Sequence, residues 1–166
     1  MSPERITIVG TGLIGASIGL AASAKGHAVS GWDPDASSLA TAAARGALVA
    51  ADSLADALAS AELVVVAAPI GALPAEVARV LAHTGEQVTV TDVGSTKASV
   101  VAAAGGSPRF VGGHPMAGSE ARGAENAAAG LFEGATWFLT PTAQTDGERH
   151  RRVHGFVADL GAFPFG

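Results

Sequence analysis

Apolar residues in this chain fall either in short continuous runs or at the three- and four-residue spacing of a helix face. The runs are rich in β-branched residues, which is typical of strands covered on both faces. We expect such strands at 5–9, 27–32, 63–68 and 87–93. Helical spacings follow the runs, and we expect helices at 13–25, 37–45, 53–60, 73–81 and 95–104. This alternation predicts an α/β fold of the Rossmann type, a doubly wound and mainly parallel sheet with helices on both faces.

The last third of the chain is less regular. We expect a short strand at 110–111, a glycine-rich loop carrying His114, no clear element at 117–134, and a strand at 135–139. A final helix is indicated by the spacing of Val153, Phe156, Val157 and Leu160. Residues 161–166 resemble the start of a further element. Because we find no repeat or linker, we expect one domain spanning 1–166.

Composition narrows the functional classes. The 166 residues are 48% hydrophobic and 15% charged, which is typical of a globular domain. The net charge of -5 and the lack of a basic stripe argue against a nucleic-acid partner. The single basic cluster, 149–152, is expected on the solvated face of a helix. The absence of cysteine excludes thiolate sites and fits a cytoplasmic protein.

Two further classes are disfavoured. The acidic residues show no metal-ligand spacing, so we expect no metal site. The uncharged stretch 6–24 could imitate a signal peptide or a membrane helix. Its β-branched start and its glycines favour a strand, a tight turn and a buried helix instead, so we expect no membrane partner.

A glycine signature, Gly10-Thr11-Gly12-Leu13-Ile14-Gly15, joins the first expected strand to the first expected helix. Gly10 allows the tight turn, Gly12 lets the backbone approach a pyrophosphate, and Gly15 lets helix and strand pack closely. The first turn of the helix then presents free N–H groups to the phosphates. We take all six residues as candidates for binding a dinucleotide.

Asp33 lies 18 residues after Gly15, at the end of the second expected strand. A carboxylate there can accept hydrogen bonds from the ribose hydroxyls and would repel a 2′-phosphate. The next arginine is Arg45, so the sequence favours NAD over NADP. Pro69, after the third strand, is a further candidate beside the cofactor. Alternatively, Asp33 is a turn residue and Pro69 a strand terminator.

Later segments resemble prephenate dehydrogenases of tyrosine biosynthesis, a pattern that arogenate and cyclohexadienyl dehydrogenases share. The segments are Asp92-Val93-Gly94-Ser95-Thr96-Lys97, Gly113-His114-Pro115-Met116-Ala117-Gly118-Ser119-Glu120, Leu131-Phe132-Glu133-Gly134 and Leu139-Thr140-Pro141. With the glycine signature, the resemblance spans nearly the whole chain. It implies NAD-dependent oxidative decarboxylation of prephenate to 4-hydroxyphenylpyruvate, in which hydride passes to NAD and a ring carboxylate leaves as carbon dioxide.

The resemblance also implies roles for individual residues. His114 would be the catalytic base toward the substrate's ring hydroxyl, a task suited to imidazole near neutral pH. Ser95 would orient that hydroxyl, and Ser119 and Glu120 would lie at the substrate mouth. Each has a plainer interpretation. His114 could be a structural histidine, Ser95 (or its neighbour in sequence) a helix cap, Glu120 an exposed loop acid, and Lys97 an ordinary lysine in the first turn of a helix.

Members of the family continue into a mostly helical second domain, which forms a homodimer and supplies an arginine to the substrate. We expect that domain to be absent from 1–166, and the chain to bind NAD but to be weakly active alone. Three alternatives stay open. They are an arogenate dehydrogenase, another small NAD-dependent hydroxy-acid dehydrogenase, and a non-catalytic NAD-binding module.

Overall fold

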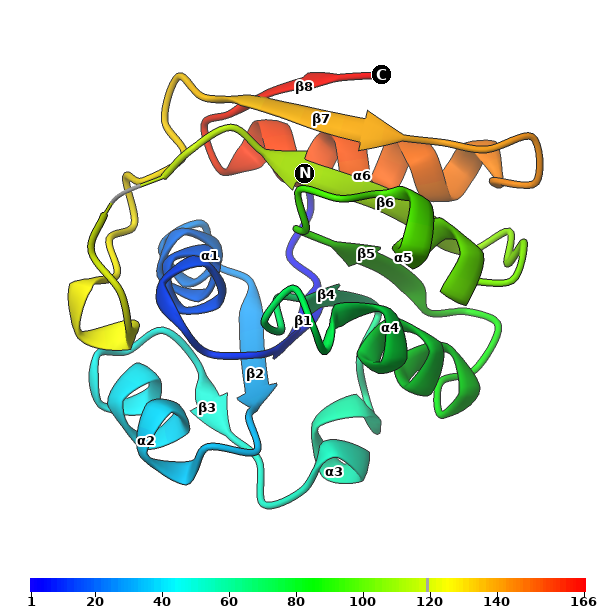
Figure 1. The fold of residues 1–166 in the computed structure, drawn as a ribbon. Helices are drawn as coiled ribbons and strands as arrows, with labels where there is room; N and C mark the ends of the chain where they lie inside the picture. The colour runs from blue at the N-terminus through cyan, green and yellow to red at the C-terminus, as the bar shows by residue number, and fades with distance from the viewer. Residues whose placement is uncertain (119) are drawn as a thin grey trace.

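A strand that is buried on both faces needs neighbouring strands for its backbone N–H and C=O groups. The computed structural model describes residues 1–118 and 120–166, whose strands form one sheet in the order β3-β2-β1-β4-β5-β6-β7-β8 (Figure 1). The strands are β1 (Arg5–Val9), β2 (Ala28–Trp32), β3 (Val49–Ala50), β4 (Leu63–Val66), β5 (Thr89–Asp92), β6 (Phe110–Pro115), β7 (Thr136–Thr140) and β8 (Phe163–Phe165). The helices are α1 (Leu13–Ala24), α2 (Ala36–Ala44), α3 (Leu54–Leu58), α4 (Leu73–Ala82), α5 (Ala98–Ala103) and α6 (Gly147–Asp159), with a 3-10 turn η1 (Ala124–Asn126).

The sheet is parallel from β3 through β6. Ile8 of β1, for example, pairs with Gly31 of β2 on one side and Val65 of β4 on the other. Strand β7 then runs antiparallel to β6, and β8 runs parallel to β7. The predicted fold class, a mainly parallel Rossmann-type sheet with helices on both faces, is confirmed. The reversed direction of β7 was not predicted.

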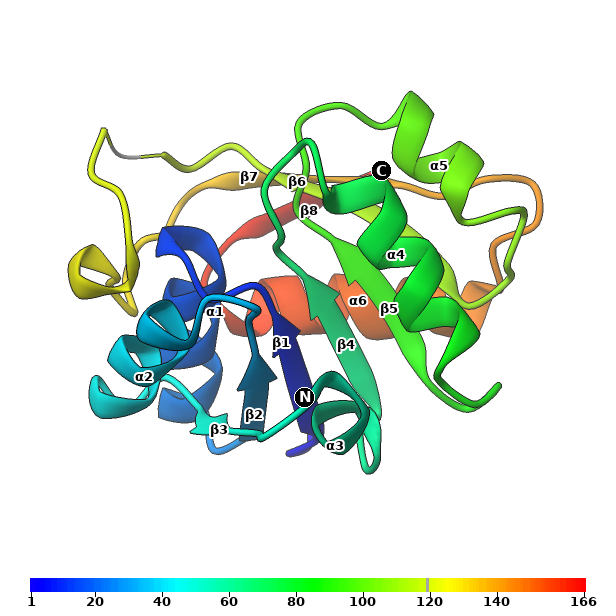
Figure 2. The same cartoon turned by 60° about the horizontal axis from the view of Figure 1, so that its bottom comes forward.

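Apolar layers cover both faces of the sheet. Successive residues of β4 point to opposite sides: Leu63 and Val65 pack with α1, α2 and α6, whereas Val64 and Val66 pack with α3, α4 and α5. Figure 2 shows α4 and α5 in front of the sheet and α6 behind it. The continuous apolar run at 63–66 is therefore explained by burial on both faces.

Helix ends follow local chemistry. The Asp35 carboxylate caps α2 by accepting from the N–H groups of Ser37 and Ser38, and the Ser53 hydroxyl caps α3. Helix α1 ends at Ala24, and the following Gly26 has a φ of 89°. Among the described residues, no helix is long and apolar enough to cross a membrane.

The structure corrects two expectations near the candidate site. Helix α5 begins only at Ala98, with Lys97 as its N-cap and no side-chain cap, so neither Ser95 nor Thr96 caps it. His114 lies in β6, which continues to Pro115, and not in a loop. The strand continues through the glycines because β7 pairs with it from Gly112 to Pro115.

The expectation of a solvated basic cluster on the last helix holds for Arg151 but is wrong for Arg149 and Arg152. Arg149 donates to the carbonyls of Glu86 and Gln87, each at 2.6 Å, and to Thr89 Oγ1 at 3.0 Å. Arg152 pairs with Glu4 at 3.0 Å. These side chains tie α6 to the amino-terminal edge of the sheet, where backbone carbonyls lack ladder partners.

His27 makes a similar connection between the start of the chain and the last helix. It precedes β2 but is buried, with only 6% exposed. Its Nδ1 accepts from the Glu4 N–H at 3.0 Å, and its Nε2 lies 2.9 Å from Asp159. His27 therefore joins the start of the chain to α6.

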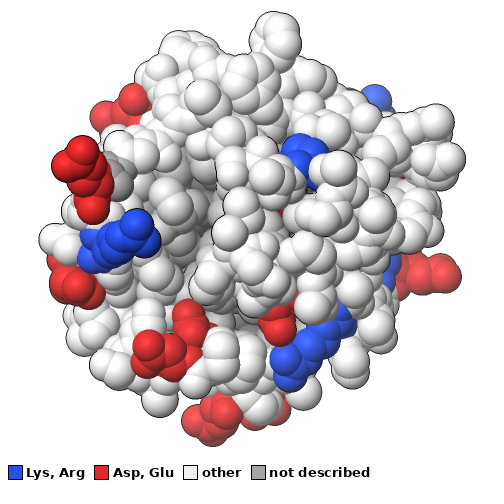
Figure 3. Space-filling model, viewed as in Figure 1, with Lys and Arg blue, Asp and Glu red and all other residues white. Residues whose placement is uncertain are grey.

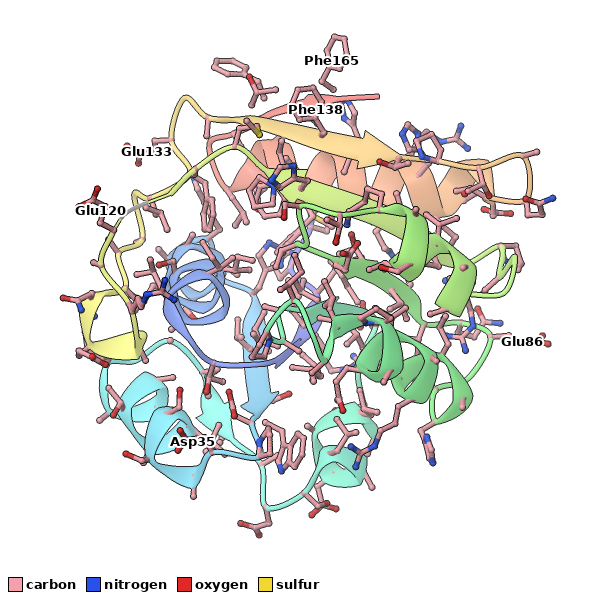
Figure 4. The ribbon with its side chains drawn as sticks, in the orientation of Figure 1. Asp35, Glu86, Glu120, Glu133, Phe138 and Phe165 are labelled. Carbon is pink, nitrogen blue, oxygen red and sulfur yellow. The ribbon has the colours of Figure 1, made fainter. Side chains whose placement is uncertain are left out.

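The outer edge of the sheet carries exposed aromatic rings. Phe138, Phe163 and Phe165 are 40%, 65% and 67% exposed. Figure 4 shows Phe138 and Phe165 at this edge, on β7 and β8. Their rings meet edge-to-face with centroids 5.8 Å apart.

We expect Arg149→Met to lower the free energy of unfolding by about 1–3 kcal/mol, because it removes charged hydrogen bonds to β5 and the segment before it. Arg151→Met is the matched control, since Arg151 is 70% exposed and pairs only with Glu148 on its own helix. It should change stability by less than about 0.5 kcal/mol. Urea denaturation measures both, and equal losses would contradict the role given to Arg149.

Candidate cofactor and active site

Two of the three glycines in the signature after β1 leave no room for a Cβ. Gly10 has a φ of 97°, and a Cβ there would lie 2.6 Å from the backbone of Ala67. A Cβ on Gly15 would lie 1.9 Å from the Gly10 carbonyl oxygen. A Cβ on Gly12, by contrast, would meet nothing within 4 Å. Gly10 and Gly15 are thus required for packing, whereas Gly12 faces open space.

The start of α1 is free to bind an anion. Its N-cap, Gly12, provides no side-chain hydrogen bond, and its first turn carries no acidic residue. Leu13 and Ile14 line the same cleft as Gly12. The N–H groups and the partial positive charge of this helix end therefore face a solvent-filled space.

Asp33 holds the glycine turn in place. Its Oδ2 accepts from the N–H of Thr11 at 2.7 Å and from the Thr11 hydroxyl at 3.1 Å. Its Oδ1 accepts from the Asp35 N–H at 2.8 Å. A carboxylate has about four acceptor positions, so one remains on Oδ1 for a ligand hydroxyl.

One cleft with a volume of about 860 Å³ brings most of the predicted residues together. Its lining includes Gly10, Gly12, Leu13, Ile14, Asp33, Pro69, Ser95, His114 and Glu120. Thr11 and Gly15 are buried behind it, and Ser119 lies outside the described residues. The face in Figure 3 is hollowed near its centre, and acidic side chains gather below the hollow, over α2 and α3.

His114 is half-buried in the cleft and lies opposite Phe138 of β7. Within the described part of the chain, its imidazole has no hydrogen-bond partner, so the expectation of a backbone-bonded structural histidine finds no support. Of the two preceding glycines, Gly113 leaves no room for a side chain, whereas a Cβ on Gly112 would make only an ordinary contact. A Cβ on Gly113 would lie 2.7 Å from the Asp92 carbonyl oxygen, and one on Gly112 would lie 3.4 Å from Lys97 Cδ.

A buried ion pair, which the sequence analysis did not predict, lies next to the segment that carries His114. Asp92, at the end of β5, is fully buried and pairs with Lys97. Asp92 also accepts from the N–H groups of Gly94 and Gly113, both at 3.0 Å. Lys97 donates in addition to the Gly113 carbonyl at 2.7 Å. The expectation of an ordinary helix lysine is therefore wrong.

The pKa of Lys97 reflects this position. Burial lowers the pKa of Lys97, and the adjacent Asp92 carboxylate partly offsets that shift. The available sequence signal was a carboxylate at the end of a strand expected to be buried, since such a charge requires a partner.

The charges lining the cleft are mostly negative. Asp35 and Glu76 lie with Asp33 on its walls, and among its described lining residues Arg122 is the only Lys or Arg. Sequence reasoning missed Arg122, which comes just after the resemblance motif. Glu120 lies on the segment that leaves β6 and points outward in Figure 4. No group of His, Asp and Glu in the described chain is placed to hold a metal ion.

Comparison with known proteins gives this cleft a context. A sequence profile described as "Prephenate dehydrogenase, nucleotide-binding domain" matches residues 18–163. The chain belongs to the prephenate dehydrogenase family. Prephenate dehydrogenase of Bacillus subtilis (strain 168) is 38% identical over 152 residues, which are 86% of this chain and 41% of that protein. A probable prephenate dehydrogenase of Streptomyces niveus is 35% identical over 95% of this chain and 43% of its own length.

Solved structures of this family have the same fold. Arogenate dehydrogenase of Synechocystis matches with a TM-score of 0.90 at 32% identity, over 97% of this chain and 58% of that one. Prephenate dehydrogenase of Aquifex aeolicus, solved with hydroxyphenyl propionate and NAD+, matches with a TM-score of 0.87 at 28% identity, over 99% and 60%. A (S)-3-hydroxybutyryl-CoA dehydrogenase from Ralstonia eutropha, at 18% identity, shares the fold alone.

The predicted family and its nucleotide-binding domain are thus confirmed. The prediction of NAD as cofactor is supported by the family match and by the NAD+ in the Aquifex relative. The chain spans less than half the length of the curated relatives that it matches. The matched region begins at residue 18 and leaves out the glycine turn. The role of that turn therefore rests on its geometry in this structure.

Two glycine substitutions separate packing from cofactor access. We expect Gly15→Ala to unfold or strongly destabilise the chain, because the added methyl would overlap the Gly10 carbonyl. Gly12→Ala should change stability by less than about 1 kcal/mol but weaken NAD binding, because its methyl enters the cleft. Thermal denaturation and NAD titration measure these effects, and full NAD affinity in Gly12→Ala would contradict this account of the turn.

Proposed function

We propose that this chain is the cofactor-binding part of a prephenate dehydrogenase and that it carries the catalytic base, His114. One observation carries the proposal: a single cleft is lined both by the glycine turn at the start of α1 and by Ser95 and His114. The proposed reaction is the NAD-dependent oxidative decarboxylation of prephenate to 4-hydroxyphenylpyruvate, a step of tyrosine biosynthesis.

The residues present fit NAD. The open space at Gly12 and the uncapped start of α1 suit the pyrophosphate, and the remaining acceptor position of Asp33 suits one ribose hydroxyl. Asp35 and Glu76 share the walls near Asp33 and add negative charge there. A 2′-phosphate would be repelled, so these charges favour NAD over NADP.

When bound, NAD supplies the nicotinamide that accepts the hydride. Positive character then develops at the ring carbon that bears the hydroxyl, and transfer of the hydroxyl proton to the His114 imidazole stabilises the forming carbonyl. Breaking the bond to the ring carboxylate releases carbon dioxide, and its electron pair restores the aromatic ring as a phenolate. The imidazolium returns the proton to that oxygen, so the histidine is regenerated.

Other lining residues would orient the substrate. Ser95 is exposed and lies on the β5–α5 connection, so its hydroxyl is available to the substrate rather than engaged as a helix cap. Glu120, at the outer rim, would contact the substrate mouth, and Ser119 is proposed beside it on sequence grounds alone. Arogenate is the alternative substrate, because the Synechocystis relative is an arogenate dehydrogenase.

The cofactor preference can be changed at Asp33. We expect Asp33→Asn with Pro34→Arg to raise the affinity for NADP relative to NAD by ~10-fold or more, because a repulsive charge is replaced by a phosphate-binding one. Pro34 is exposed and lines the cleft, so its replacement does not disturb the core. Asp33→Asn with Pro34→Gln is the control. An unchanged ratio of the two affinities would count against the role of Asp33.

His114 is tested by NADH formation from prephenate, using this chain and the same chain with any natural downstream sequence. We expect His114→Asn to lower kcat by ~10²–10⁴-fold without weakening NAD binding. Native-like turnover by His114→Asn would remove it as the base.

The same assay separates the remaining alternatives. NADH formed from arogenate but not from prephenate would identify arogenate as the substrate. NAD binding with no turnover of either compound, in both forms of the chain, would favour a non-catalytic module. Turnover only in the extended form would indicate that this chain supplies part of the active site.

A further inference from the structure

The two candidate catalytic residues, Ser95 and His114, lie on segments that are not paired with each other in the sheet. Ser95 follows β5, and His114 lies near the end of β6. The pairing between these strands covers Val90 with Phe110 and Thr91 with Val111, and it stops before both site residues. Their relative position must therefore be fixed by other contacts.

Asp92 and Lys97 make these contacts. Asp92 accepts from the Gly113 N–H, and Lys97 donates to the Gly113 carbonyl, so side chains hold this residue at both of its peptide groups. The pair also closes the short loop that carries Ser95, because Asp92 precedes the loop and Lys97 follows it. One ion pair thus contacts both segments, immediately before His114.

The surroundings leave this arrangement little freedom. Asp92 is fully buried, and the Lys97 side chain is only 18% exposed. Charge-assisted hydrogen bonds in such a place are strong, and removing one partner leaves the other as an unpaired buried charge. The close approach of Gly113 to the Asp92 carbonyl further limits movement of β6.

We propose that Asp92 and Lys97 are the positioning residues of this active site and that they hold His114 in place relative to Ser95. The proposal rests on the proposed function of the cleft. Neither residue is among those that line the cleft, so both act through their neighbours rather than by touching the substrate. Loss of the pair should lower turnover without weakening NAD binding. The glycine turn, which we propose binds NAD, follows a different strand, β1.

A purely structural role for the pair is the alternative, and the chain offers a matched control for it. Arg149 also ties β5 to another element through charged hydrogen bonds, but it does so near the opposite end of that strand. If Lys97 only stabilises the fold, Lys97→Met and Arg149→Met should have similar effects on the cleft.

The experiment compares the native chain with Lys97→Met, Lys97→Arg and Arg149→Met. It measures NAD affinity, amide hydrogen exchange by NMR, and NADH formation from prephenate. The Gly113 N–H donates to Asp92, and Lys97 donates to the Gly113 carbonyl. Lys97→Met removes the second bond and leaves the Asp92 carboxylate unpaired, so the segment should open more often. We therefore expect exchange of the Gly113 N–H to rise by ~10–100-fold relative to exchange at Ile8 in the core. The kcat should fall by a similar factor with NAD affinity unchanged. Lys97→Arg should recover part of the loss, and Arg149→Met should show neither effect.

Native-like kcat and Gly113 exchange in Lys97→Met would overturn the proposal, as would an equal fall in kcat in Arg149→Met. If Lys97→Met does not fold, the double variant Asp92→Asn/Lys97→Met leaves no unpaired charge buried and is compared in the same way. Failure of the native chain to bind NAD would instead remove the proposed function, and exchange at Gly113 would still decide whether the pair holds this segment.

Discussion

The distance between α1 and the turn after β1 is the constraint on which the rest of this structure depends. The helix begins almost in contact with the Gly10 carbonyl, and Gly10 itself packs against the backbone of Ala67 after β4. These contacts set the start of α1 beside the carboxyl ends of β1 and β4. The turn then stays within reach of the carboxylate of Asp33, the residue that follows β2. The lack of a side chain at Gly10 and Gly15 thus determines the positions of the helix, the turn and the acidic end of the cleft.

The first two thirds of the fold could be predicted from the sequence. Strands β1, β2, β4 and β5 lie within the expected ranges, and all of them except β2 are buried on both faces. The last third could not be predicted as well. Gly112 and Gly113 suggested a loop, yet both are strand residues, and the lack of a side chain at Gly113 lets β6 pack against Asp92. The direction of β7 depends on the connection after β6, in which no periodic pattern is present.

The candidate site, too, could be predicted only in part from the sequence. The glycine turn, Asp33, Ser95 and His114 could be placed together because each lies at or just after the end of a strand, at the same edge of the sheet. The partners of the buried charged side chains could not be predicted from the spacing of residues along the sequence. Asp92 and Lys97 are close in sequence, but their shared contact, Gly113, comes from the next strand. Arg149 of α6 binds carbonyls of a segment some sixty residues earlier.

The aromatic edge formed by β7 and β8 bears on how copies of this domain behave in concentrated solution. An edge strand with exposed apolar rings is a potential template for pairing with another chain. Pro164, at the centre of β8, has no N–H to donate and therefore interrupts the row of groups that such pairing requires. Association through this edge would have to rely on the rings of Phe138, Phe163 and Phe165 rather than on a continuous backbone ladder. The same strand thus carries exposed aromatic rings together with a proline that limits backbone pairing.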